Sequence, residues 1–338
     1  MQKCLVAVLA IVSGVLSPHT MYARGQNPSR VETTLIGSFP GAQLTFPVAI
    51  NNHGVIAGNA QNLNFTGRDA AFLWTPDDGF QVIGDDTVLT DLNDRGDATG
   101  YRCRWVTGDD GSTSCVPRGF IWNQRTGLVD IDVDGMIPNA INNRGDVAGT
   151  CGNLQACALR GGVLNAWPCE LEDCSTEATA INDRGDVVVN RGAMNFIGEV
   201  TVYPLRGTPI LFAEGSGGAD INNARIIAGS FYELTPARSR ITAALWTRSG
   251  GVRPPSEPEG LFVALNARAL SVGFLFGTNE DFRSHAIAWD AKRDELLELA
   301  QTVESQAVDV NDRGQIVGYM QGDQPFWSTQ IAIWTVRR

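Results

Sequence analysis

The chain has 338 residues, of which 43% are apolar, and its formal net charge is −11. This apolar fraction is enough for a packed core and excludes a globally disordered chain. The strong negative charge disfavours DNA, RNA and anionic lipid as partners unless a local basic patch overrides it.

The N-terminus has the pattern of an export signal. Lys3 precedes an apolar run of 13 residues, CLVAVLAIVSGVL. The run is too short to span a bilayer comfortably, but it suits the hydrophobic region of a signal peptide. We therefore predict a signal over residues 1–23, cleaved after Ala23, and an uncleaved anchor is the alternative. The mature chain, residues 24–338, is expected to be one domain, secreted or periplasmic and without a membrane span.

Seven related segments of ten residues follow along the mature chain. They read AINNHGVIAG, DLNDRGDATG, AINNRGDVAG, AINDRGDVVV, DINNARIIAG, ALNARALSVG and DVNDRGQIVG. Their aligned asparagines are Asn51, Asn93, Asn142, Asn182, Asn222, Asn266 and Asn311, at spacings of 42, 49, 40, 40, 44 and 45 residues. A period of this size is typical of solenoids and propellers.

Each repeat has a second anchor, a short apolar segment that in five repeats ends in tryptophan. These tryptophans are Trp74, Trp122, Trp246, Trp289 and Trp334. Between the anchors, short alternating apolar runs are separated by Gly, Asn, Asp and Pro, which predicts four short strands per repeat. Four strands in about 40–45 residues match the size of a propeller blade.

The two ends of the repeat array complement each other. The last repeat stops after its tryptophan strand, whereas the segment VETTLIG stands before the first asparagine as an unassigned strand. Pairing TTLIG with IAIWTV would complete the seventh blade and close a ring, which removes exposed sheet edges. We therefore predict an all-β fold, a seven-bladed β-propeller of four-stranded blades closed by its N-terminal strand.

The repeat AINxxGxVxG, followed about 20 residues later by AFLW, resembles the HAF repeat of bacterial extracellular repeat proteins. The leading segment LIGSFPGAQLTFPVAIN is similar to the one that precedes the first repeat in that family. The resemblance implies an exported, propeller-like protein and no particular reaction.

The repeated residues have structural explanations. Asparagine followed by glycine suits a tight turn, in which the amide oxygen accepts backbone N–H groups and glycine adopts positive φ. Arg-Gly-Asp at 95–97, 144–146 and 184–186 could instead be an adhesion tag, and the acidic turns could bind calcium in a few blades. No other cofactor is expected. The tryptophans are expected to pack between blades, with each indole N–H finding a partner.

Six cysteines remain after the predicted signal. An even number in an exported chain predicts disulfides, and proximity favours Cys103–Cys115, Cys151–Cys157 and Cys169–Cys174. Zinc is the rival explanation, but the chain contains no Cys-x-x-Cys pair. These pairs would staple loops on the face opposite the asparagine turns.

Function in propellers generally resides on the loops that differ between blades. The long second-to-third-strand loops are expected at 101–118, 150–157, 230–240, 274–284 and 319–329. The candidate ligand contacts on them are Arg102, Arg104, Trp105, Asp109 and Asp110 in the second repeat, Tyr232, Glu233, Arg238 and Arg240 in the fifth, Glu280, Asp281, Arg283 and His285 in the sixth, and Asp323 and Trp327 in the seventh.

These observations favour a monomeric, non-catalytic module that binds a carbohydrate, a peptide or an envelope protein through its stapled loop face. The mature chain has only two histidines, His53 and His285, and no nucleophile-elbow motif, so no catalytic residue is assigned. An extracellular polysaccharide hydrolase or lyase with acidic residues near the central pit is the alternative. A purely structural fragment is the third.

Overall fold

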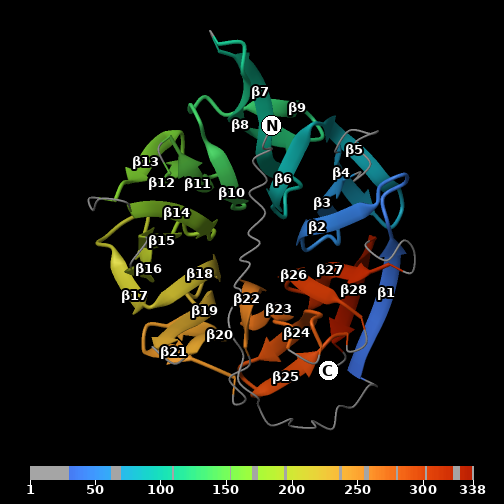
Figure 1. Ribbon diagram of the computed structural model, residues 1–338, viewed down its shortest axis with the longest axis vertical. Helices are drawn as coiled ribbons and strands as arrows, with labels where there is room; N and C mark the ends of the chain where they lie inside the picture. Colours follow the sequence, from blue (N-terminus) through green and yellow to red (C-terminus); the bar gives the residue numbers. More distant parts are fainter. Residues whose placement is uncertain are drawn as a thin grey trace.

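The computed structural model describes residues 30–61, 70–108, 110–152, 154–169, 174–193, 196–235, 238–254, 259–278, 281–300, 303–322 and 328–336. These residues form 28 strands, arranged as seven four-stranded antiparallel sheets. The sheets stand around a central channel as the blades of a seven-bladed β-propeller (Figure 1), which confirms the predicted fold. The predicted signal peptide, residues 1–23, lies outside the described residues.

Each blade takes four strands in sequence from the channel outward, apart from the seventh. Blade one holds β2 (Leu44–Ile50), β3 (Ile56–Gln61), β4 (Ala70–Thr75) and β5 (Gly79–Asp85). Blade two holds β6 (Thr87–Leu92), β7 (Ala98–Thr107), β8 (Thr113–Asn123) and β9 (Gly127–Asp130). Blade three holds β10 (Ile137–Ile141), β11 (Val147–Cys151), β12 (Gln155–Arg160) and β13 (Val163–Trp167). Blade four holds β14 (Cys174–Ile181), β15 (Val187–Ala193), β16 (Phe196–Tyr203) and β17 (Ile210–Glu214).

The remaining blades continue the ring. Blade five holds β18 (Ser216–Ile221), β19 (Ile227–Thr235), β20 (Arg238–Thr247) and β21 (Gly250–Val252). Blade six holds β22 (Gly260–Leu265), β23 (Leu270–Leu275), β24 (His285–Asp290) and β25 (Glu295–Glu298). Blade seven holds β26 (Ser305–Val310), β27 (Gln315–Gln321) and β28 (Thr329–Val336), and its outer strand is β1 (Val31–Gly37).

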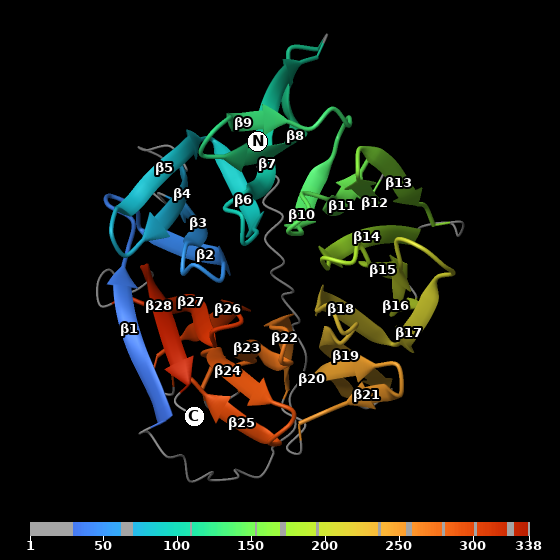
Figure 2. The ribbon, with the colours of Figure 1, turned by 180° about the vertical axis from the view of Figure 1, so that it is seen from behind.

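Strand β1 closes the ring as predicted. It pairs antiparallel with β28, with Val31 opposite Val336 and Thr33 opposite Trp334. Figure 2 shows β1 along the outer side of blade seven, next to β28. Because β28 is hydrogen-bonded on both sides, the chain ends do not leave its edge free to template aggregation.

The innermost strand of every blade carries a bulge at the same place. The register shifts three residues before the repeat asparagine in each of the seven blades. A bulge inserts one residue and redirects the backbone that follows it. The last glycine of the repeat lies opposite this bulge, and a Cβ at Gly100 would lie 1.9 Å from the carbonyl oxygen of Val88. Blade four has Val189 at the equivalent position.

The core lies between blades. Trp246 packs with Val188 and Val200 of the preceding blade, and Trp334 packs likewise with Val272 and Ala288. The predicted inter-blade role of the tryptophans is therefore confirmed. The expected partner for each indole N–H is not found for Trp246, Trp289 and Trp334, whose Nε1 atoms are buried without a hydrogen-bond partner among the described residues. Their rings lie among apolar side chains, and dispersion and desolvation hold them there without a polar contact.

Two of the predicted long loops are instead extended hairpins. Strands β7 and β8 pair from Ala98 to Thr107 and cover most of the segment 101–118, which was expected to be irregular. Strands β19 and β20 do the same in blade five. The backbone hydrogen bonds of each pair continue beyond the blade, where residues 104–107 of β7 are exposed on both faces.

Candidate functional site

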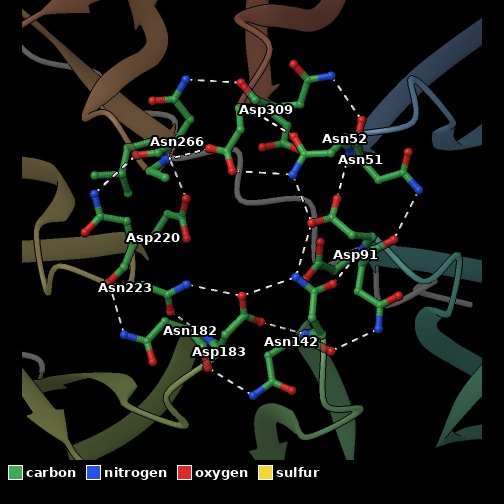
Figure 3. Close-up of a pocket in the computed structure, with 18 of the residues that line it drawn as sticks. Asn51, Asn52, Asp91, Asn142, Asn182, Asp183, Asp220, Asn223, Asn266 and Asp309 are labelled. Carbon is green, nitrogen blue, oxygen red and sulfur yellow. Dashed lines mark hydrogen bonds between the residues drawn. The ribbon is translucent and has the colours of Figure 1, made fainter.

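The central channel is lined by the repeat asparagines, which form a closed ring of hydrogen bonds (Figure 3). The Nδ2 of each asparagine donates to the carbonyl oxygen of the asparagine in the next blade, and the seven distances are 2.9–3.2 Å. The last of these bonds joins Asn311 to Asn51 and so connects the final repeat to the first. The ring holds all seven blades together at the channel.

The side-chain oxygen of each repeat asparagine stabilises the predicted turn. Asn142 Oδ1 accepts the backbone N–H groups of Arg144 and Asp146, both at 2.9 Å. Gly145 follows at a φ of 84°, a conformation that costs glycine little. In blades five and six, where the turn position has no glycine, Arg225 and Ala269 adopt the left-handed conformation instead, at 60° and 63°.

A second tier at the channel mouth is formed by the residue after each repeat asparagine. Around the ring these residues are Asn52, Asp94, Asn143, Asp183, Asn223, Ala267 and Asp312. In six blades a side-chain oxygen accepts the backbone N–H of the preceding blade at 2.7–3.0 Å. Asparagine and aspartate alternate, so each carboxylate lies beside amide donors, and Ala267 interrupts the alternation.

A third tier consists of aspartates two residues before the repeat asparagine, in blades two, five and seven. Each carboxylate accepts one N–H from its own blade and one from the next. Asp309, for example, accepts from Val310 and Ile50, both at 2.7 Å. Asp91 and Asp220 make the equivalent bonds at 2.7–2.9 Å. The backbone after the bulge directs these N–H groups toward the channel, so the three aspartates tie blades two to three, five to six and seven to one.

The environment of these carboxylates raises their pKa. Desolvation by the surrounding protein is the main cause, and it raises the pKa of Asp91 to about 7 and that of Asp309 to about 8. It also raises the pKa of Asp220. The accepted N–H bonds oppose the shift, whereas repulsion from Asp91 and Asp220 adds to it at Asp309. The side chains are partly exposed to the channel, but protein encloses the channel around its circumference.

The channel is about 210 Å³ in volume. Its polar groups are largely occupied by the three tiers, since both oxygens of each deep aspartate already accept a hydrogen bond. This arrangement makes the channel a hydrogen-bonded collar lined by asparagine and aspartate side chains. Sequence reasoning named acidic residues near the pit only in general terms. The repeat alignment could have found Asp91, Asp220 and Asp309, because all three occupy the same repeat position.

The raised pKa values predict that stability decreases from about pH 5 to pH 9. The folded protein binds more protons than the unfolded chain between the ordinary carboxyl pKa of 3.8 and the folded values near 7–8, so raising the pH favours unfolding over that window. We expect Asp309→Asn to reduce this loss of unfolding free energy by about 2 kcal/mol, because the variant has no carboxyl group to titrate at this position. The value is smaller than the full pKa shift implies, since solvent in the channel screens part of it.

Urea unfolding of both proteins at pH 5 and pH 9 measures this effect. Asp77→Asn, at an exposed turn, removes the same charge outside the channel and is expected to leave the pH dependence unchanged. Equal pH dependence for the wild type and Asp309→Asn would contradict the prediction. The pKa of Asp281 is held below its usual range by Arg283. Such a carboxylate makes the free energy of unfolding increase with pH, but only under conditions more acidic than this window.

The stapled face lies at the other end of the blades. Three disulfides join Cys103 to Cys115, Cys151 to Cys157 and Cys169 to Cys174, which confirms the predicted pairing. The first crosses the hairpin of β7 and β8, which projects from blade two (Figure 1). Disulfides are typical of oxidising compartments, so three of them are consistent with a secreted or periplasmic protein.

The candidate residues of blade two lie on this hairpin. Arg102 and Arg104 share one face, Trp105 lies on the opposite face and is 61% exposed, and Asp110 is in the turn at the tip. Asp110 accepts hydrogen bonds from Ser112, which lower its pKa and stabilise the turn. Asp109 lies outside the described residues.

The candidates in blades five and six form separate ion-pair networks. In blade five, Glu233 accepts a hydrogen bond from Arg253 at 3.0 Å, and Arg240 lies 3.4 Å from Glu259. Tyr232 is half-buried on β19, and Arg238 begins β20. In blade six, Arg283 donates to both oxygens of Asp281. Glu280, Asp323 and Trp327 lie outside the described residues, and the described candidates occupy three different blades instead of one site.

The histidine of blade six is not arranged as a catalytic base. His285 Nδ1 lies 3.3 Å from the carbonyl oxygen of Ala300, and Nε2 lies 3.1 Å from Asp281 Oδ2. Both ring nitrogens therefore face acceptors, and neither is available to activate a hydroxyl nucleophile. The nearby Ser284 hydroxyl is directed to the carbonyl oxygen of Ser305. His53 is exposed on the turn face, away from the stapled hairpins.

Within the described part of the chain, no group of three or more His, Cys, Asp or Glu side chains is spaced to hold a metal ion. The same residues include no helix of the length and apolarity that a bilayer crossing requires.

Comparison with known proteins identifies the class of fold. The propeller domain of the Trilobed protease from Pyrococcus furiosus, described as having an open velcro topology, superposes with a TM-score of 0.59 at 10% identity, over 86% of this chain and 95% of that one. Streptogramin B lyase gives a TM-score of 0.46 at 8% identity, over 91% and 99% of the two chains. No protein-family model and no curated protein matches the chain. The likeness therefore shows a β-propeller and no activity.

Proposed function

We propose that this protein is an exported, non-catalytic propeller of the HAF-repeat type that binds a carbohydrate, a peptide or an envelope protein through its stapled face. The observation that carries the proposal is the hairpin of β7 and β8, which projects from blade two with Trp105 61% exposed and is crossed by Cys103–Cys115. A large exposed aromatic side chain on a preorganised element is a common anchor for a ligand, because little entropy is lost when it binds.

The rest of the molecule supports a binding role over a catalytic one. The channel carboxylates and the blade-six histidine are occupied by hydrogen bonds that fix the structure. The outer part of the hairpin, in contrast, extends beyond the blade to which it belongs, and residues 104–107 of β7 are exposed.

A panel of neutral and charged glycans and peptides tests the proposal. We expect saturable binding that Trp105→Ala weakens at least tenfold, with no product released from any glycan. Phe282→Ala, which removes an aromatic ring that is 85% exposed on blade six, serves as the matched control and is expected to have no effect. Binding that survives both Trp105→Ala and the Cys103→Ser, Cys115→Ser double variant would refute a role for the hairpin.

A second candidate function rests on the channel. Raised pKa values at Asp91 and Asp309 suit a general acid, and such groups gather at active sites, so a polysaccharide hydrolase or lyase is the alternative. Turnover of a polysaccharide that Asp91→Asn or Asp309→Asn abolishes, with the fold intact by circular dichroism, would establish the enzyme and reject the binding module.

A further inference from the structure

Three arginines gather on one face of the stapled hairpin. Arg102 and Arg104 are two positions apart on β7, and successive side chains of a strand alternate between faces, so these two share a face. Arg118 on β8 is paired directly opposite Arg102 and therefore lies on the same face. The three side chains, with Cys103 and Asp130, line a pocket of about 430 Å³.

The carboxylates around this face do not balance its charge. Asp130 accepts a hydrogen bond from Arg102 at 2.8 Å, and Asp134, which is fully exposed, lies 3.8 Å from Arg118. Arg104 is exposed and has no carboxylate partner among the described residues. Arg102 and Arg118, which are directly opposite each other, therefore each have one carboxylate nearby, and the excess positive charge of the face belongs to Arg104. An anionic ligand would supply the carboxylate that Arg104 lacks.

The spacing and chemistry of the face favour carboxylates in a linear chain. Arg102 and Arg104 are about 7 Å apart along the strand and Arg118 about 5 Å across it, which suits successive charged groups of an extended ligand. The planar guanidinium fork matches a carboxylate in a bidentate geometry. Duplex DNA, with a charge about every 1.7 Å, would be repelled by the rest of a protein whose net charge is −11. A polysaccharide with one carboxylate per sugar is much less densely charged.

We propose that the face formed by Arg102, Arg104 and Arg118, the arginine face, binds a linear polysaccharide that carries carboxylates, such as a polyuronate. The inference rests on the proposed binding function and specifies its ligand class. The disulfide Cys103–Cys115 and the paired strands fix the spacing of the arginines before binding, which lowers the ordering cost. Trp105, on the other face of the same hairpin, offers a platform for a sugar ring from a second segment of the chain.

The test compares an oligogalacturonide with its fully methyl-esterified form by isothermal titration calorimetry at two salt concentrations. We expect esterification to weaken binding at least tenfold and added salt to weaken binding of the acid form only. Arg104→Gln and the Arg102→Gln, Arg118→Gln double variant should each weaken binding of the acid form about 10- to 100-fold. Arg125→Gln, in the exposed turn between β8 and β9, is the matched control and should stay within twofold.

Several results would overturn the inference. Equal binding of the ester, unchanged affinity of Arg104→Gln, or tighter binding of poly-glutamate or duplex DNA would each reject a polyuronate. If a neutral glycan or a peptide binds and only Trp105→Ala weakens it, the arginine face is rejected while the proposed binding function stands. If no glycan or peptide in either panel binds, the arginine face is rejected and the proposed binding function is restricted to an envelope protein. Melting temperatures of the variants within a few degrees of the wild type exclude unfolding as the cause of any loss.

Discussion

Asn142→Ala is expected to lower the free energy of unfolding by about 3–5 kcal/mol. The residue is 4% exposed, and its side chain makes four hydrogen bonds. Alanine would leave the N–H groups of Arg144 and Asp146 without their acceptor, and the carbonyl oxygen of Asn182 would keep only the N–H of Gly185. Each buried group that loses its partner costs about 1–3 kcal/mol. The ring of asparagine hydrogen bonds would also be interrupted between blades three and four.

Equilibrium unfolding in urea measures this loss. Asn123→Ala is the matched control, because Asn123 Oδ1 accepts the N–H groups of Arg125 and Thr126 in a similar turn that is exposed to solvent. We expect the control to cost less than about 1 kcal/mol, since water replaces the lost acceptor. Similar losses in the two variants would show that the asparagine acts only on its own turn and that the ring of amides adds nothing.

Removing strand β1 is expected to have a larger effect. A chain that begins at Ser38 lacks the partner that covers β28 from Ile331 to Val336. It also loses Ile36, which packs against the cluster that joins blades seven and one. We expect the free energy of unfolding to fall by more than about 5 kcal/mol, together with association of the chains through the exposed edge of β28. Urea unfolding and light scattering after gel filtration, compared with a chain that begins at Arg30, measure both effects.

The shorter chain also permits a rescue experiment. A synthetic peptide with the sequence of Val31–Gly37 should bind in trans by strand addition and restore the monomer, whereas a scrambled peptide should not. Arg30→Ala in the longer chain separates the strand from the ion pair between Arg30 and Glu295. A monomeric Ser38 chain with an unchanged urea midpoint would contradict the role of β1 in closing the ring.

The sequence predicted the parts of the fold that recur with the period. Aligned asparagines gave the number of blades, and the unmatched strand before Asn51 gave the closure, because both follow from order along one chain. The disulfides were predictable for a similar reason, since each joins cysteines no more than 12 residues apart. The order and spacing of residues along the chain are enough to predict the number of blades, their closure and the disulfide pairs.

The channel was less predictable because it depends on contacts between repeats. Asp309 and Ile50 are 259 residues apart, and nothing local indicates that one accepts a hydrogen bond from the other. The bulge that exposes the N–H of Ile50 has no single-residue signature either. The hairpin of β7 and β8 was expected as a loop because the segment between the second and third strands is long and differs between repeats, whereas its Gly, Ser and Asp residues concentrate at the tip. Its three arginines meet only because the two strands pair in one register.

The alternation of asparagine and aspartate at the channel mouth is limited by the odd number of blades. Two kinds of residue can alternate without a fault around a circle only if the number of places is even, and this propeller has seven. Ala267 occupies the place where two like neighbours would otherwise meet. In the deeper tier, the position that would tie blade three to blade four is Ala140, and the one that would tie blade four to blade five is Ala180. Neither interface of blade four therefore has an aspartate from this tier. The blades are therefore not identical copies: the odd number requires at least one departure from alternation, and in this chain that departure is at Ala267.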